Sequence, residues 1–135
     1  MKKIKKFKIK SFSSAAGKLI PLNFDKQFPM RVKRVFFLHG NKNKIRGDHA
    51  HKKCSQVFFA IKGKIKINMK YKNTNKNVFL DYNKSKALLV PPRIWSSVEF
   101  LNNNSLVLVL TDYEYDFKDY IETYKEFIAF QKRNK

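Results

Sequence analysis

Residues 46–63 read RGDHAHKKCSQVFFAIKG, a histidine-containing segment followed by an apolar run and a glycine. His49 and His51 are two residues apart, and in an extended chain such residues project to the same face. We therefore expect both imidazoles to point into one cavity, as in a metal site or an acid–base pair. The alternative is two solvent-facing histidines in a basic loop. The run Gln56–Ile61 that follows predicts a β-strand.

The chain from about residue 30 to residue 111 repeats this pattern of short β-type runs separated by turn-forming residues. Between Lys64 and Met69 apolar and polar residues alternate strictly, as in a strand with one buried and one wet face. Gly63 suits the hairpin turn before this strand. Residues 73–77 predict a second turn, and residues 40–44 predict a looser polar loop. The predicted strands are 32–38, 56–61, 64–71, 78–82, 87–90, 95–101 and 106–111.

After residue 111 the apolar period changes from 2 to about 3.6, which predicts a C-terminal helix with Asp116 as its N-cap. We expect its aromatic stripe to pack against the outside of the sheet. The sequence has no internal repeat and no linker, so one all-β domain over residues 1–135 is predicted, a barrel or jelly roll closed by a helix. The stripe consists of Phe117, Tyr120, Ile121, Tyr124, Phe127 and Ile128.

The composition predicts a soluble cytoplasmic protein without a membrane segment. Hydrophobic residues make up 43% of the 135-residue chain, enough for one core. The apolar runs fall well below the ~20 residues of a membrane-spanning helix, and no signal-peptide core follows the lysine-rich start. Cys54 is the single cysteine, so an internal disulfide is excluded and we interpret the thiol as incidental.

The net charge of +20 raises the question of a polyanionic partner. Of the 30 basic residues, 25 are lysines that are scattered through every segment, whereas nucleic-acid readers favour arginine concentrated on one face. We interpret the lysines as a solvated surface and expect no nucleic-acid partner beyond weak, charge-driven binding.

The spacing of Gly47, His49, His51, Gln56 and Gly63 resembles the first cupin motif, G(X)5HXH(X)3-4E(X)6G. The resemblance implies a double-stranded β-helix, the cupin jelly-roll barrel. Two departures concern metal binding. Gln56 stands where cupins place a glutamate ligand, and the segment 91–97 (PPRIWSS) has serines where a second motif offers a histidine. Two remaining ligands are too few for a typical catalytic zinc or iron site, so we predict neither metal nor cofactor.

Several further segments resemble the nucleotide-sugar 3,4-ketoisomerases of the RmlC-like cupins over residues 25–130. The resemblance implies conversion of dTDP-4-keto-6-deoxyglucose to a dTDP-3-keto-6-deoxyhexose, in deoxyamino sugar biosynthesis for surface polysaccharide such as lipopolysaccharide. It also implies a homodimer in which N-terminal strands join the partner's sheet. One departure is Phe36-Phe37, where relatives often have tyrosine. The matching segments are 34–37 (RVFF), 46–52 (RGDHAHK), 90–95 (VPPRIW), 112–113 (DY) and 119–121 (DYI).

Moving a carbonyl from C4 to C3 needs a base that removes the C3 proton, because an enediol can then be reprotonated at C4. By resemblance to the related epimerases, His49 is the leading candidate for the carbon-bound proton and His51 its partner at the oxygens. Arg46 would pair with the diphosphate or with enolate charge; its alternative is a surface arginine. Arg93 and Trp95 could bind the phosphate and the thymine, and for Trp95 core packing is the alternative.

Two rival functions stay open from the sequence. A sugar-nucleotide epimerase shares the barrel and the histidine base but normally needs an opposing tyrosine. A non-catalytic basic barrel that binds nucleic acid or polysaccharide is favoured by the charge and disfavoured by the His-x-His spacing.

Overall fold

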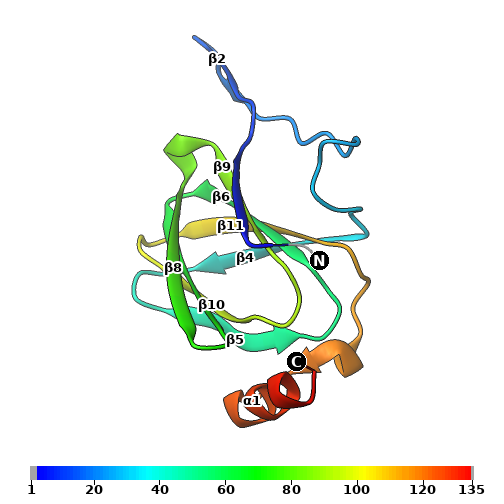
Figure 1. The fold of residues 1–135 in the computed structure, drawn as a ribbon. Coiled ribbons are helices and arrows are strands. Elements are labelled where there is room, and N and C mark those ends of the chain that lie inside the picture. Colours follow the sequence, from blue (N-terminus) through cyan, green and yellow to red (C-terminus); the bar gives the residue numbers. More distant parts are fainter. Residues whose placement is uncertain (1–2, 135) are drawn as a thin grey trace.

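The computed structural model describes residues 3–134 and contains two five-stranded antiparallel sheets that face each other (Figure 1). This architecture confirms the predicted all-β barrel with a C-terminal helix. The first sheet consists, in order, of β1 (Lys5–Lys8), β9 (Lys86–Val90), β6 (Gln56–Lys62), β11 (Ser105–Thr111) and β4 (Arg34–Gly40). The second consists of β12 (Tyr120–Ile121), β5 (Ile45–His51), β10 (Trp95–Phe100), β7 (Lys64–Tyr71) and β8 (Thr74–Asp81).

The main core lies between the two sheets. Ile65, Ile67 and Met69 of β7 are completely buried there, while the lysine and asparagine side chains between them face outward, so the predicted alternation is confirmed. They pack with Phe58 of β6 and Phe100 of β10, among others. Because apolar side chains from both sheets share this cluster, it joins the sheets into one body.

A second apolar cluster covers the outer face of the first sheet. The segment between β3 and β4 lays Phe28 and Met30 over Val57 and Phe59 of β6. Before that segment, the hairpin of β2 (Phe12–Ser14) and β3 (Gly17–Leu19) projects from the barrel at the top of Figure 1. Neither this hairpin nor β1 was predicted, because their short polar runs lack a clear period.

The predicted turn at residues 73–77 is wrong, since β8 already begins at Thr74. The turn that joins β7 to β8 is shorter than predicted and uses the left-handed backbone conformation of Lys72, with φ of 51°. The side-chain nitrogen Nδ2 of Asn68 donates hydrogen bonds to the side-chain oxygens of Asn75 and Asn77, at 2.7 Å each. These side-chain bonds across β7 and β8 explain how an asparagine-rich run forms a strand.

The predicted helix is also wrong in its first half. Asp116 caps a short 3-10 helix, η2 (Phe117–Asp119), and β12 follows it before α1 (Tyr124–Arg133) begins at its N-cap Thr123. A second 3-10 helix, η1 (Tyr82–Lys84), joins β8 to β9. Within residues 3–134, no helix is long and apolar enough to cross a membrane.

Candidate active site

A β-bulge in β5 positions the histidine pair. Ser96 of β10 lies opposite His49 and Val98 opposite Arg46, so three steps along β5 match two along β10. Gly47 and Asp48, with φ of 100° and 43°, therefore face the single residue Ser97. A Cβ on Gly47 would lie 3.2 Å from the Ser96 carbonyl oxygen. Because cross-strand partners share a sheet face, the bulge puts Arg46 and His49 on the same face although they are three residues apart.

His49 and His51 lie side by side, as the two-residue spacing predicted. Their ring centroids are 5.0 Å apart with the planes at 79°. The two rings differ in environment, because His51 is buried whereas His49 is only half-buried. His49 Nδ1 lies 2.7 Å from the carbonyl oxygen of Gly47, which leaves Nε2 as the nitrogen available to a ligand.

Asp119 fixes the orientation of His51. Its Oδ2 lies 2.9 Å from His51 Nδ1, and its Oδ1 accepts a hydrogen bond from the backbone N–H of Lys53 at 2.7 Å. The pairing of Tyr120 with His51 between β12 and β5 holds Asp119 at this distance. A carboxylate on Nδ1 favours the tautomer with the proton on Nδ1, so Nε2 is a proton acceptor.

Burial lowers the pKa of His51 below its ordinary value of 6.5. The hydrogen bond to Asp119 acts in the opposite direction, and the nearby charge of His49 adds to the lowering. The net direction keeps the His51 imidazole neutral near pH 7, the form in which it can accept a proton.

Tyr120 completes the group of rings at this end of the barrel. Its ring centroid is 4.5 Å from that of His51 and 5.0 Å from that of His49. The Tyr115 ring lies next to that of Tyr120, with the centroids 5.7 Å apart and the planes tilted by 49°, and the guanidinium of Arg34 lies 5.2 Å from the Tyr115 ring. Sequence reasoning missed Tyr120 because it fits the period of the predicted helix; its place in the segment 119–121 (DYI) was the available signal.

The rings of His51, Tyr115 and Tyr120 line a small hollow at the mouth of the barrel, which we call the histidine hollow. Buried polar residues of β6 and β11 form part of its wall, and exposed residues after β11 form its edge. Its lining residues are Arg34, His51, Cys54, Gln56, Thr111, Tyr113, Glu114, Tyr115, Asp116, Asp119 and Tyr120.

Cys54 is a buried free thiol in this wall. Burial raises the pKa of the thiol to about 12, and the negative charges of Asp112 and Asp119 act in the same direction. Without a bound cation it is therefore a neutral, unreactive thiol near pH 7.

The structure does not bring all predicted binding residues to the histidines. Arg46 is exposed on the histidine face. The backbone N–H of Arg93 donates to the His51 carbonyl at 2.7 Å, while its guanidinium lies 5.6 Å from the Phe130 ring of α1. Trp95 is buried against Phe127 of α1, on the opposite face of β10 from Ser96.

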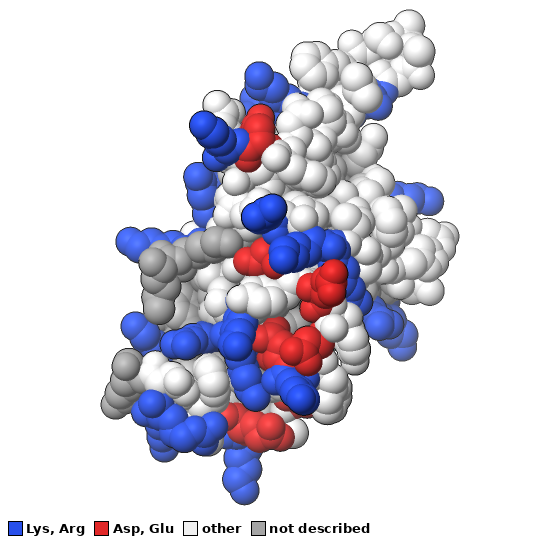
Figure 2. Space-filling view, turned by 90° about the vertical axis from the view of Figure 1, so that its right-hand side faces the viewer, with Lys and Arg blue, Asp and Glu red and all other residues white. Residues whose placement is uncertain are grey.

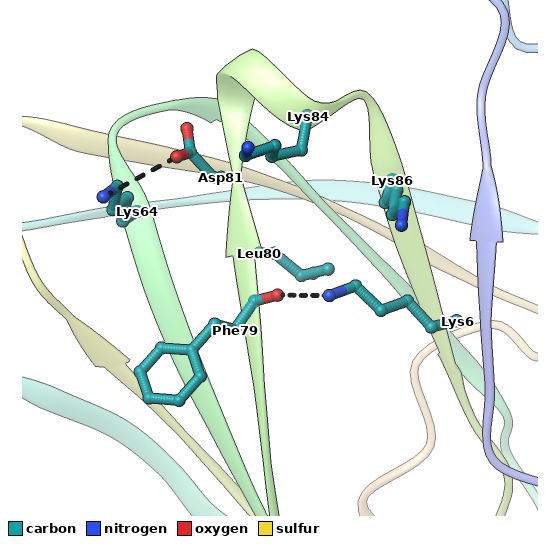
Figure 3. A pocket seen from close by; sticks show the side chains of 7 residues that line it. All are labelled: Lys6, Lys64, Phe79, Leu80, Asp81, Lys84 and Lys86. Atoms are coloured by element: carbon teal, nitrogen blue, oxygen red, sulfur yellow. Dashed lines mark hydrogen bonds and ion pairs between the residues drawn. The ribbon is translucent and has the colours of Figure 1, made fainter.

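A larger hollow lies elsewhere, between the edge strand β8 and the strands β9 and β1 (Figure 3). It encloses about 420 Å³, and we call it the lysine hollow. Lys6 Nζ donates to the Phe79 carbonyl at 3.0 Å, and Lys64 Nζ lies 3.8 Å from Asp81 Oδ2 (Figure 3). No histidine lines the lysine hollow, so it could bind an anion through its lysines but has no imidazole for proton transfer. The hollow is lined by Lys6, Lys64, Phe79, Leu80, Asp81, Lys84 and Lys86.

Comparison with known proteins agrees with this geometry. The family model described as FdtA: WxcM-like, C-terminal, matches residues 2–132. The TDP-4-oxo-6-deoxy-alpha-D-glucose-3,4-oxoisomerase of Aneurinibacillus thermoaerophilus is 29% identical over 119 residues, covering 87% of this chain and 85% of that protein.

Solved structures agree with the fold as well. The sugar 3,4-ketoisomerase QdtA from Thermoanaerobacterium thermosaccharolyticum, in complex with TDP, superposes with a TM-score of 0.89 at 30% identity, covering 97% of this chain and 96% of that one. The RmlC epimerase of Mycobacterium tuberculosis is 15% identical, with a TM-score of 0.77 over 87% of this chain and 66% of that one. The latter likeness shows the shared cupin fold alone.

Proposed function

Starting from the fact that the chain belongs to the FdtA family of WxcM-like C-terminal domains, we propose that it is a TDP-sugar 3,4-ketoisomerase. The observation that supports this most directly is the pair His49 and His51 at the mouth of a cupin barrel, with His51 fixed by Asp119. The proposed substrate is dTDP-4-keto-6-deoxyglucose, and the product is a dTDP-3-keto-6-deoxyhexose.

The proposed reaction moves two protons and needs no net oxidation. His49 removes the proton on C3 and the electrons form an enediolate with the C4 carbonyl. A proton then passes from the C3 oxygen to the C4 oxygen. Finally His49 returns its proton to C4, and C3 becomes the ketone. The half-buried His49 faces the carbon acid, and the buried neutral His51 serves the oxygens through Nε2.

We propose Arg46 as the contact to the diphosphate or to enolate charge, because it shares the histidine face and is exposed. Arg93 is a second candidate, tied through its backbone to His51. Thymine stacking by Trp95 stays a prediction, and the contacts of the ring with α1 support the packing alternative.

We also propose that the reaction uses neither metal nor organic cofactor. Gln56, the residue at the usual glutamate position, is a neutral and poor ligand for a hard or borderline cation. Ser96 lies directly opposite His49, where a second-motif ligand would be needed. Proton transfer at carbon next to a carbonyl requires only a positioned base and charge stabilisation.

The finer biological assignments are proposals of the same kind: one cupin domain over residues 1–135, cytoplasmic, in deoxyamino sugar biosynthesis for surface polysaccharide such as lipopolysaccharide. We propose a homodimer as well. Phe12 and Leu19 are exposed on the projecting hairpin, and Val35 and Phe37 are exposed on the edge strand β4. A second copy of the chain would cover such apolar side chains.

The rival epimerase is favoured by one observation, the presence of Tyr120 beside the imidazoles, with Tyr115 next to Tyr120. A phenol there could act as the opposing acid. The position of the carbonyl in the product, read by NMR, separates the two: a ketone at C3 supports the ketoisomerase, whereas a ketone retained at C4 with an inverted neighbouring carbon supports the epimerase.

A further inference from the structure

Three different metal-ligating side chains meet in the wall of the histidine hollow. One ligand atom each of His51, Cys54 and Asp119 lies within 4.8 Å of the other two. The residues come from β5, from the connection to β6, and from η2, so the fold rather than local sequence brings them together. Nitrogen, sulfur and oxygen donors are the set that zinc binds, and three protein ligands leave a fourth position open.

A second observation concerns the other nitrogen of the His51 ring. His51 Nε2 is buried and has no hydrogen-bond partner among the described residues. Buried polar atoms are nearly always paired, and an exception calls for a missing partner. The His51 side chain is only 7% exposed, so a ligand that reaches this ring, whether the proposed substrate or an ion, is shielded from bulk water.

The charge around the hollow favours a cation. Glu114, Asp116 and Asp119 line it, against the guanidinium of Arg34. Six of the ten acidic residues of this strongly basic chain lie between residues 112 and 126. Figure 2 shows acidic side chains gathered in the middle of one face, with lysine and arginine side chains around them.

We propose that His51, Cys54 and Asp119 form an inhibitory site for a borderline-soft divalent cation of the zinc type. The site differs from the cupin metal site, because Gln56 and the serines at 96 and 97 take no part. When the ion binds, the Cys54 thiol releases its proton to solvent and the thiolate becomes a ligand. The ion takes the place of the proton between His51 Nδ1 and Asp119 Oδ2, and that proton moves to Nε2. The ring then can no longer accept a proton at Nε2 and is lost to proton transfer. The inhibition rests on the proposed ketoisomerase function; the binding does not.

Binding is tested on the full chain after removal of metals with a chelator and exchange into chelator-free buffer. Co²⁺ serves as the spectroscopic probe and Zn²⁺ as the calorimetric one. We expect a thiolate-to-cobalt charge-transfer band in the wild-type protein, displaced by Zn²⁺. Cys54→Ala and the nearly isosteric Cys54→Ser should both abolish the band and weaken Zn²⁺ binding by about 10-fold or more. Glu114→Gln, at the edge of the hollow, is the matched control and should keep the band.

Inhibition is tested separately, as the ratio of turnover with and without Zn²⁺ within each variant. The ratio should be low for the wild type and for Glu114→Gln, and near one for the Cys54 variants. Absence of the cobalt band in the wild type, or equal Zn²⁺ affinity in Cys54→Ser, overturns the site. Binding without inhibition of an active enzyme overturns the inhibitory role. A protein with no isomerase activity that still shows the band contradicts the proposed function and leaves the site standing.

Discussion

The two histidines of the site have different surroundings, and this difference predicts separable roles. His49 is the proposed base at carbon, so His49→Asn keeps a polar side chain but removes the titratable nitrogen. Turnover should fall by roughly 10²–10⁴-fold, while dTDP binding, measured by calorimetry, should persist. His39→Asn is the matched control, since His39 is exposed on β4, five residues along the strand from Arg34. Near-normal turnover in His49→Asn would remove His49 from the mechanism.

His51→Asn tests the division of labour between the rings. Turnover should fall here too, but exchange of the C3 proton with deuterated solvent should continue, because His49 can still deprotonate the carbon. NMR of the substrate in deuterated buffer measures this exchange. If exchange survives in His49→Asn and vanishes in His51→Asn, the two roles are reversed.

Burial of His51 also predicts a pH dependence of stability. Its pKa is lowered on folding, with His49, Asp119 and Arg34 as the charged groups that act on it. As the pH falls through 6.5, the unfolded chain takes up a proton at this residue that the folded protein does not. The free energy of unfolding should therefore decrease as the pH falls from 6.5 towards the lower folded pKa. The free energy of unfolding, measured with urea at several pH values in this range, should depend less steeply on pH in His51→Asn than in His39→Asn. An equal pH dependence in the two variants would contradict the prediction.

At the scale of elements, the bulge in β5 positions His49, and Gly47 makes the bulge possible. In Gly47→Ala the new Cβ would sit 3.2 Å from the Ser96 carbonyl oxygen and 3.3 Å from Ser97 Cα, on a backbone with φ of 100°. We expect a loss of about 1–3 kcal/mol in unfolding free energy together with reduced turnover.

Gly17→Ala is the control for the backbone cost alone. Gly17 also has a positive φ, 134°, but a Cβ there meets nothing within 4 Å. Urea unfolding and turnover are compared for both variants. If Gly47→Ala is as stable as Gly17→Ala and fully active, the bulge does not position the base.

The sequence predicted most strands between residues 32 and 111 but not β5, and it predicted the terminal elements poorly, for identifiable physical reasons. Strands such as β7 bury one face, so Ile65, Ile67 and Met69 leave a period of two in the sequence. Residues 117–121 follow a helical period, but pairing of β12 with His51 and Ala50 of β5 holds two of them in a strand. A long-range pairing of this kind leaves no local signal.

The sequence predicted only part of the candidate site, for the same reason. His49 and His51 were predicted because their spacing alone puts them on one strand face. Asp119 and Tyr120 lie 68 and 69 residues after His51, and their contacts with it exist only once β12 has joined β5. The sequence did not predict the bulge in β5 either. The register between β5 and β10 decides which sheet face Arg46 lies on, and that register is set only in the folded sheet.

At the scale of the whole molecule, the net charge of +20 predicts weak and salt-sensitive binding of nucleic acid. The lysine hollow is a concentration of this charge, with Lys84 and Lys86 beside Lys6. Affinity for a labelled oligonucleotide, measured by fluorescence anisotropy, should collapse between low and physiological salt. Binding of dTDP should change less, because it involves one diphosphate. Tight RNA binding at physiological salt would favour the basic binding module instead.

The position of the carbonyl in the product tests the central claim most directly. The protein is incubated with dTDP-4-keto-6-deoxyglucose in the presence of a chelator, and ¹³C NMR follows the ketone, with His49→Asn as the inactive control. We predict that the C4 ketone signal is replaced by a C3 ketone in the wild-type reaction and persists in the control. A ketone that stays at C4, with or without inversion of a neighbouring carbon, would contradict the assignment of this chain as a 3,4-ketoisomerase.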